Sequence, residues 1–198
     1  MKDKEIYISI DIESDGPIPG PNSMLSLGAA AFDLDNGGHL IDTFEVNFEL
    51  LEGAEPDPDT ADFWAKNKHA YERTRVNTVH AITGMERFRA WIYSVATPLS
   101  ARPVATAFPA SFDFMFVYWY LVRFTGDSPF GFHAFDMKTA AALTLNIPFK
   151  SASKRNFPRA WFPPGKPHTH VAVDDAIEQG HMFVNMMKQH RWRMNSKA

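Results

Sequence analysis

Cysteine is absent from the 198-residue sequence. This absence excludes disulfide bonds, thiolate nucleophiles and zinc sites built on thiolates, and it fits a reducing cytosol. Long apolar stretches are also missing. No uncharged run reaches the roughly 18 apolar residues of a membrane-spanning helix, and the N-terminus begins with alternating charges instead of a signal-like apolar core. We therefore expect a soluble, cytoplasmic protein that is not exported.

Charge of one sign is missing from two long segments, although the net charge is only -3. Segment 33–62 contains ten Asp or Glu residues and no Lys or Arg. Segment 150–170 contains no acid and five cations: Lys150, Lys154, Arg155, Arg159 and Lys166. A local positive field of this kind can steer a phosphate chain toward a site. The basic segment is therefore either a phosphate-facing surface or a solvated loop, and the charges alone favour neither.

Apolar residues make up 45% of the chain and charged residues 22%, which is ordinary for a globular protein. The length allows one sizeable core, and 17 Phe and 5 Trp indicate that aromatic rings fill much of it. No repeat, low-complexity tract or linker interrupts the sequence. We expect a single domain over residues 1–198.

The predicted elements follow the order of three strands, two helices, and then alternating strand and helix. The helix over 62–74 is expected to begin at a cap formed by Asp59 or Thr60. The ring-rich segment 112–124 would also suit a strand, but its length and its position after a turn favour a helix. Strands are predicted at 6–12, 24–35, 39–50, 102–108 and 130–136, and helices at 62–74, 85–95, 112–124, 137–145 and 171–190. This order predicts an α/β fold in which a mixed sheet, begun by a three-strand antiparallel meander, is covered by helices on both faces.

Two carboxylates stand at the end of the first predicted strand. Asp11 and Glu13 are two residues apart and would therefore share one face of the sheet, about 6 to 7 Å from each other. A divalent cation would relieve their repulsion, and Mg²⁺ and Mn²⁺ prefer such hard oxygen ligands. An acid at a strand end can equally be the polar start of a turn.

Two further acidic stretches lie in hydrophobic surroundings: SFDFMF around Asp113, and HVAVDDA from His170 to Ala176. Taken alone, Asp113 would more readily be a helix cap and Asp175 a first-turn residue that favours the helix dipole. A lone His170 would usually be a surface or capping residue. The three acidic stretches therefore gain meaning only as a set.

As a set, these residues resemble the three motifs of the DEDDh 3'-5' exonuclease family. Asp11 and Glu13 in DIESDGP form the first motif, Asp113 the second, and His170 with Asp175 in HVAVDD the third. The resemblance spans residues 5–180. It implies a ribonuclease-H-like fold, in which two parallel strands extend the meander to a mixed five-stranded sheet, and a metal-dependent 3'-5' exonuclease activity.

The resemblance also implies a role for each residue. Asp11 would bridge two Mg²⁺ or Mn²⁺ ions, Glu13 and Asp175 would complete the first ion site, and Asp113 would serve the second, partly through water. His170 would be the general base. Two ions about 3.5 to 4 Å apart can supply what phosphodiester hydrolysis needs, namely an activated water, a neutralised phosphate and a stabilised leaving oxygen. A histidine titrates near neutrality, so His170 can accept a proton that ionised acids cannot.

Three residues beside the motifs compete for these roles or support them. His168 lies on the same loop as His170, but its spacing to Asp175 does not match the motif. Asp15 and Asp174 are spare acids, which we expect to be solvated or to support the motif residues.

The sequence departs from the family pattern at several positions. Phe108 and Pro109 stand where many members carry Asn before the second-motif Asp, which puts the contact of that Asn in doubt. Pro17 occupies the place of an apolar residue that wedges against terminal bases, while Ser14 conservatively replaces a common Thr. The stretches PGPNSMLSLGAAAFD and PDPDTADFW also resemble a smaller bacterial and phage branch of exoribonuclease-like proteins.

The segment 150–169 is long, irregular and contains four prolines. Such loops are often functional, although a mobile surface insertion is an alternative. Because the segment leads into His170, we expect it beside the active site. Its Lys154, Arg155 and Arg159 would contact phosphates, and Phe157 or Trp161 would stack on a base.

The leading hypothesis is a two-metal exonuclease that releases nucleoside monophosphates from single-stranded RNA or DNA 3' ends. RNA is slightly preferred because of the resemblance to the exoribonuclease-like branch. One alternative is a non-cutting nucleic-acid-binding module of the same fold. Another is a proofreading subunit of a polymerase, for which the sequence shows no evident tethering tail.

Overall fold

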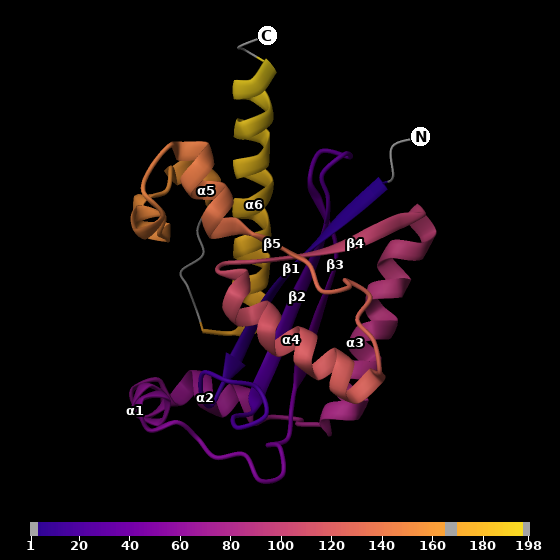
Figure 1. Cartoon of the computed structure of the whole chain (residues 1–198), viewed down its shortest axis with the longest axis vertical. Helices are drawn as coiled ribbons and strands as arrows, with labels where there is room; N and C mark the ends of the chain where they lie inside the picture. The colour runs from indigo at the N-terminus through magenta and orange to yellow at the C-terminus, as the bar shows by residue number, and fades with distance from the viewer. Residues whose placement is uncertain (1–3, 165–169, 196–198) are drawn as a thin grey trace.

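The computed structural model describes residues 4–164 and 170–195, in which the strands form one five-stranded mixed sheet (Figure 1). β1 is antiparallel to β2 and parallel to β4, while β2–β3 is antiparallel and β4–β5 parallel. The sheet order is β3-β2-β1-β4-β5, with β1 Lys4–Ser14, β2 Met24–Asp33, β3 His39–Asn47, β4 Ala101–Ala107 and β5 Ala134–Asp136. The predicted α/β sheet, a meander extended by two parallel strands, is confirmed.

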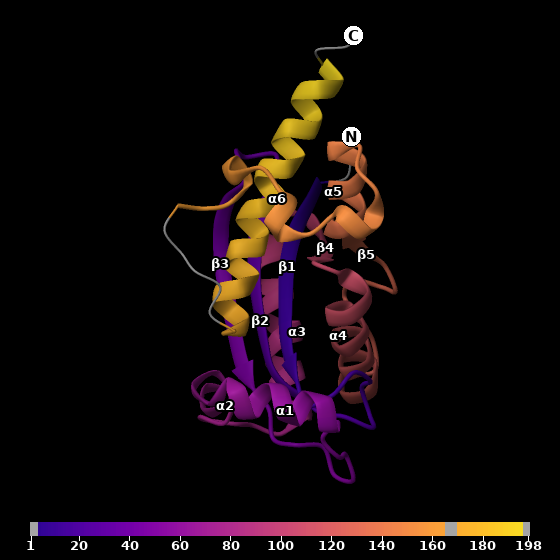
Figure 2. The ribbon, with the colours of Figure 1, turned by 90° about the vertical axis from the view of Figure 1, so that its left-hand side faces the viewer.

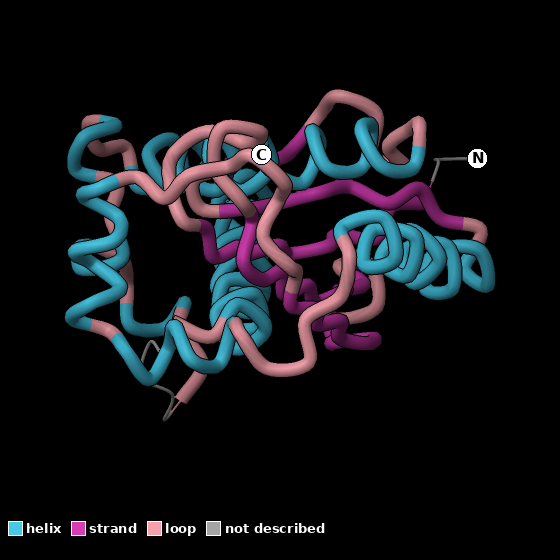
Figure 3. Tube along the Cα trace, turned by 90° about the horizontal axis from the view of Figure 1, so that it is seen from below, coloured by secondary structure: helices cyan, strands magenta, loops and turns pink. Residues whose placement is uncertain are grey.

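Helices cover both faces of the sheet and its lower end. α3 and α4 pack on one face, α6 crosses β1 and β2 on the other, and α1 and α2 lie below the strand ends (Figure 2). Seen from below, the strands run between helices on both sides (Figure 3). The helices are α1 Pro58–Lys66, α2 Lys68–Thr74, α3 Ala81–Ala96, α4 Ala110–Thr125, α5 Met137–Leu145 and α6 Ala172–Asn195, with short 3-10 turns at Thr97–Leu99, Phe149–Ser151, Lys154–Asn156 and Arg159–Trp161.

The alternation of β1 divides the core into two clusters. Four isoleucines of β1 at even positions, from Ile6 to Ile12, pack with α3 and α4, whereas Tyr7 faces the cluster beneath α6. Successive strand residues point to opposite faces, so the odd positions Asp11 and Glu13 lie on the α6 side. The hydrophobic pattern of one strand therefore places both acids toward the same helix.

A glycine lets α6 approach the acidic end of β1. Gly28 on β2 is the cross-strand partner of Asp11. A Cβ atom at Gly28 would collide with the backbone of Ala172 and Val173, the first residues of α6. The absence of a side chain at this position therefore allows the start of α6 to lie directly beside the acid pair.

Two predicted elements differ from the observed ones. The helix predicted over 62–74 is two helices, because Asn67 leaves the helical region with φ -116° and ψ 44°. α1 also begins earlier than predicted. Its cap is Asp57, whose Oδ1 accepts a hydrogen bond from the Thr60 amide at 3.0 Å, and Pro58 suits the first turn. The strand predicted over 130–136 keeps only Ala134–Asp136.

The ring-rich segment is a helix, as predicted, and a carboxylate from the next strand fixes its start. Asp136 Oδ2 accepts a hydrogen bond from the Ala110 amide at 2.9 Å, and Asp136 Oδ1 accepts one from the Thr139 amide at 2.7 Å. One side chain thus caps both α4 and α5. This cap positions the first turn of α4, which carries Asp113.

Within the described ranges, no helix combines the length and the apolar character that a membrane crossing requires.

Candidate metal centre

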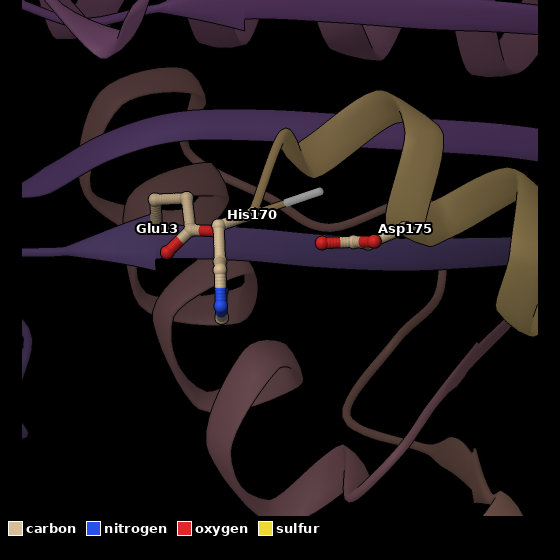
Figure 4. A group of neighbouring side chains, drawn as sticks. All are labelled: Glu13, His170 and Asp175. Atoms are coloured by element: carbon tan, nitrogen blue, oxygen red, sulfur yellow. The ribbon is translucent and has the colours of Figure 1, made fainter. Parts of the chain in front are cut away.

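The third predicted motif meets the first at the start of α6. Glu13, His170 and Asp175 each offer a ligand atom, and these atoms lie within 4.8 Å of one another. Figure 4 shows Glu13 on its strand, and His170 and Asp175 at the start of α6, around one common space. Two segments separated by more than 150 positions in the sequence therefore supply one cluster of metal-ligating groups.

The second motif joins this cluster through the first turn of α4. Asp113 is 5% exposed, and its Oδ1 accepts a hydrogen bond from the backbone amide of Ile12 at 3.1 Å. Ile12 lies between the two acids of β1. The bond therefore ties the second-motif carboxylate to the strand segment that carries Asp11 and Glu13.

His170 has an unusual backbone conformation. Its φ is 53°, in the left-handed region that non-glycine residues rarely adopt. Its ring meets the ring of Phe63 on α1 edge to face, with the centroids 5.5 Å apart. Backbone strain of this kind often occurs at functional sites, where surrounding contacts hold it in place. The conformation and the Phe63 contact together fix the position of the imidazole beside Glu13 and Asp175.

The acids strongly perturb one another. Burial raises the pKa of Asp11 well above its usual value, and the negative charges of Asp113, Glu13 and Asp175 raise it further. Burial, followed by the charges of Asp175 and Asp113, raises the pKa of Glu13 to about 8. Burial also raises the pKa of Asp113 to about 7, against the opposing effect of the Ile12 amide. Among the described residues, the positive charge near Asp11, Glu13 and Asp113 is therefore too small to keep these three carboxylates ionised.

This charge deficit fits divalent cations. Oxygen ligands from several carboxylates are what Mg²⁺ and Mn²⁺ prefer, and a neighbouring cation would favour the ionised form of each acid. The residues that would hold the ions are Asp11, Glu13, Asp113 and Asp175, the four acids of the predicted set.

One lysine of the basic segment reaches the acids. Lys154 lies in a short 3-10 turn, and its Nζ is 2.8 Å from Oε2 of Glu178 on α6. Its positive charge lowers the pKa values of Asp11 and Asp113. The predicted position of the basic loop beside the acids therefore agrees with the structure at Lys154, while Arg155 and Arg159 are exposed.

A cavity of about 330 Å³ adjoins Glu13. The end of β1, the loop after it, α1 and the first turn of α4 form its walls. Its lining residues include Glu13, Pro17, Thr60, Phe63, Trp64 and Phe112. The Trp64 indole Nε1 donates a hydrogen bond to the Ser14 carbonyl at 2.8 Å, which holds α1 against the end of β1. An apolar, ring-lined cavity with a carboxylate cluster at its edge is suited to a flat ring joined to a phosphate.

No family model matches the sequence. A comparison with curated proteins finds the 3'-5' DNA exonuclease Cap18 of Escherichia coli, 33% identical over 188 residues that cover 91% of both chains. Among solved structures, the nuclease domain of 3'hExo, a DEDDh family member bound to rAMP, has a TM-score of 0.65 at 10% identity, over 93% of this chain and 92% of that chain. The chain belongs to the DEDDh 3'-5' exonuclease family.

Other solved DEDDh exonuclease relatives share the fold. Escherichia coli exonuclease I, in complex with a dA16 oligonucleotide, has a TM-score of 0.65 at 10% identity, over 97% of this chain and 43% of that chain. Likeness at this identity establishes the fold alone, whereas the 33% identity to Cap18 establishes the family. This DEDDh exonuclease is therefore a nuclease that acts on nucleic acid, and the predicted alternative of a non-cutting module is set aside.

The stacking role predicted for Phe157 and Trp161 is wrong. Phe157 is 8% exposed and Trp161 1% exposed, and their rings pack against each other with centroids 5.2 Å apart. Phe157 also meets Phe108 edge to face, and the Trp161 indole donates a hydrogen bond to Gln189 on α6. These rings anchor the basic loop to α6, so their faces are not open to a base.

Two further predictions concern residues near the motifs. Asp15 is not solvated. It is 5% exposed and accepts a hydrogen bond from the Ser23 amide, so it holds the loop after β1. His168, the competitor of His170, and Lys166 lie outside the described residues.

The sequence-based reasoning missed two groups of residues. Glu178, the partner of Lys154, and Gln179, which contacts Asp11, follow Asp175 by three and four positions on α6. That helical spacing was a usable signal. Phe63 and Trp64 on α1 carried no signal, because the contact of α1 with the end of β1 depends on the tertiary fold.

The raised pKa values predict how stability depends on pH without metal. The pKa of Glu13 is about 8 in the folded protein and ordinarily 4.5, so the folded state binds this proton more tightly. The stabilisation is complete below about pH 4.5 and is lost as the pH rises through 8. In chelator at pH 8, Glu13→Gln should therefore unfold at a higher temperature than wild type, and the difference should shrink toward pH 4.5. Equal melting temperatures at both pH values would contradict the repulsion inferred for this cluster.

Proposed function

We propose that the protein is a two-metal 3'-5' exonuclease that hydrolyses single-stranded ends and releases nucleoside 5'-monophosphates. The observation that carries the proposal is the meeting of ligand atoms of Glu13, His170 and Asp175 within 4.8 Å of one another, beside Asp11 and Asp113, whose pKa values are both raised. A binding surface alone would not require four buried or half-buried carboxylates and a histidine at one point.

The reaction assigns a role to each part of the site. Water attacks the terminal phosphorus, and the bond from phosphorus to the 3' oxygen of the penultimate nucleotide breaks. That oxygen takes a proton from solvent water and becomes the new 3' hydroxyl. His170 accepts the proton of the attacking water. The acids Asp11, Glu13, Asp113 and Asp175 would hold the divalent ions, which supply activation of the water and neutralisation of the phosphate charge.

We propose that the cavity beside Glu13 receives the 3'-terminal nucleoside. Phe63 and Phe112 offer rings to the base, and Pro17, which stands in place of the family's wedging residue, lies in the same wall. A duplex end would have to unpair to enter a cavity of about 330 Å³, which favours single-stranded substrates.

Two similarities point to different sugars in the substrate. The sequence resemblance slightly favours RNA, whereas the relative with 33% identity is named a DNA exonuclease. We therefore propose single-stranded DNA as the first substrate to assay, with RNA of the same sequence beside it.

The decisive experiment uses purified protein with 3'-labelled and 5'-labelled oligonucleotides, as DNA and RNA, single-stranded and duplex, with Mg²⁺, Mn²⁺ or chelator. The proposal expects labelled mononucleotide from the 3' end, a ladder from the 5' label, and no product in chelator. Activity that persists in chelator would overturn the two-metal assignment. Equal rates on blunt duplex would overturn the single-strand preference.

The exposed arginines of the basic loop should act on binding more than on chemistry. In an Arg155→Ala, Arg159→Ala double variant, KM for an oligonucleotide should rise roughly tenfold with little change in kcat. The slope of log KM against log salt should fall by about 0.7 for each lost phosphate contact on a single strand. A fall in kcat with an unchanged salt slope would exclude this loop as an electrostatic guide.

Two further variants help to interpret the KM of the double arginine variant. Arg123→Ala is the matched control, because Arg123 is exposed on the last turn of α4, ten residues or about 15 Å along the helix from Asp113. It should leave KM unchanged. Lys154→Ala, measured separately, should also affect kcat, because Lys154 lies beside the acids.

A further inference from the structure

A buried glutamine on α6 contacts the first acid of the site. Gln179 is 2% exposed, and its Nε2 donates a hydrogen bond to Oδ1 of Asp11. Its own oxygen, Oε1, is buried without a hydrogen-bond partner among the described residues. The glutamine therefore satisfies the acid while its own acceptor goes unsatisfied.

The unpartnered oxygen of Gln179 lowers the stability of the packing around it. A buried acceptor without a partner destabilises the fold, and an apolar side chain of similar volume, such as Met, would avoid this cost. Packing against the α6 side of the sheet therefore does not explain an amide at this position. The hydrogen bond from Gln179 to Asp11 explains it.

The Gln179 amide lies on the same face of α6 as Asp175 of the third motif. Gln179 follows Asp175 by four residues, so both side chains lie on one face of α6. Gly28 lets the start of this helix approach the strand beside Asp11. One rigid helix therefore carries both an acid of the site and a hydrogen-bond donor to the central acid on β1.

We infer that Gln179 is a positioning residue that fixes the carboxylate of Asp11 for the two ions. Its amide holds Oδ1 and so restricts the rotation of the carboxylate plane, which would leave the other oxygen available as a ligand. Partners of this kind orient metal ligands, and their loss typically costs 10-fold to 100-fold in metal affinity or activity. The inference rests on the proposed metal site.

The test compares Gln179→Met with Gln189→Met. Gln189 lies on the same helix, where its Oε1 accepts a hydrogen bond from Trp161 Nε1 at 2.6 Å. Both variants therefore remove one side-chain hydrogen bond from α6, but only one of the bonds involves Asp11. Divalent binding is measured by calorimetry, and melting temperatures are measured in chelator and in Mn²⁺.

For Gln179→Met we expect the dissociation constant for Mn²⁺ to rise about 10-fold to 100-fold and the melting shift caused by Mn²⁺ to shrink. KM for the oligonucleotide should stay unchanged, and high Mn²⁺ should recover part of kcat. Gln189→Met should lower the melting temperature in chelator but keep wild-type metal affinity. If Gln179→Met does not fold, Gln179→Asn, whose shorter amide does not reach Asp11, should show the same loss of affinity.

The outcomes separate this inference from the proposed function. Wild-type protein that binds no divalent ion would overturn the proposed metal site itself. Wild-type protein that binds Mn²⁺, with a folded Gln179 variant of equal affinity, would overturn only the role of Gln179.

Discussion

Asp11→Asn is expected to abolish divalent-ion binding at millimolar concentrations and to lower kcat by about 10³ or more, since metal-ion catalysis of hydrolysis contributes several kcal/mol to transition-state stabilisation. Asp11 stands at the centre of the cluster. Its carboxylate feels the charges of Asp113, Glu13 and Asp175 and accepts the hydrogen bond from Gln179. The Asn side chain has nearly the same shape, so the change removes charge and a ligand oxygen but little packing.

In the absence of metal, by contrast, Asp11→Asn should stabilise the fold. Burial and like charges disfavour an ionised Asp11, so removing it should raise the melting temperature in chelator near pH 8. Addition of Mn²⁺ should raise the melting temperature of wild type and leave that of the variant nearly unchanged. A variant that is more stable and yet inactive cannot owe its inactivity to misfolding.

Asp174→Asn is the control for this prediction. Asp174 lies next to Asp175 on α6 and is half-buried, but it stands outside the predicted ligand set. Its replacement should leave metal affinity and kcat within a few-fold of wild type. Calorimetry with Mn²⁺ and hydrolysis of a labelled oligonucleotide measure both quantities. Wild-type metal affinity in Asp11→Asn would refute the central role of this carboxylate.

The parts of the site that were predictable from sequence rest on strand periodicity. The alternation of β1 puts Asp11 and Glu13 on one face whatever packs against them, and the structure keeps them there. The motif order then implied that Asp113 and Asp175 would come to the same sheet end. Topology supplies this meeting, because β4 runs parallel to β1 and α4 starts directly after β4.

The parts that were not predictable depend on contacts between distant segments. Trp161 is an aromatic residue in a basic loop, a pattern that equally suits base stacking and anchoring in a core. Its burial follows from the contact of its loop with α6, which no local pattern encodes. The break at Asn67 carried no Pro or Gly signal either. There the Asn67 side-chain Nδ2 donates a hydrogen bond to the Phe63 carbonyl at 2.9 Å, a local bond that competes with continuation of the helix. At Trp161, by contrast, tertiary packing decides the outcome.

His170→Ala should lower kcat by about 10² to 10⁴, the usual contribution of a positioned general base. The structure holds the imidazole beside Glu13 and Asp175, by a left-handed backbone conformation and by the ring of Phe63. An imidazole can accept a proton from the attacking water where carboxylates that hold metal ions cannot. Single-turnover hydrolysis of a labelled oligonucleotide at saturating Mn²⁺ measures the loss.

The His170→Ala variant also tests whether His170 is a general base or a metal ligand. Both roles are open because an atom of His170 lies close enough to Glu13 and Asp175 to hold an ion with them. If His170 is the base, metal affinity survives in His170→Ala, whereas Asp175→Asn weakens metal binding and activity together. Log kcat of wild type should rise with pH through the histidine range, and this limb should vanish in the His170 variant. His168→Ala should keep this rise of log kcat with pH, and its kcat should stay within a few-fold of wild type. Loss of metal affinity in His170→Ala would make His170 a ligand, and full activity would require another group to accept the proton.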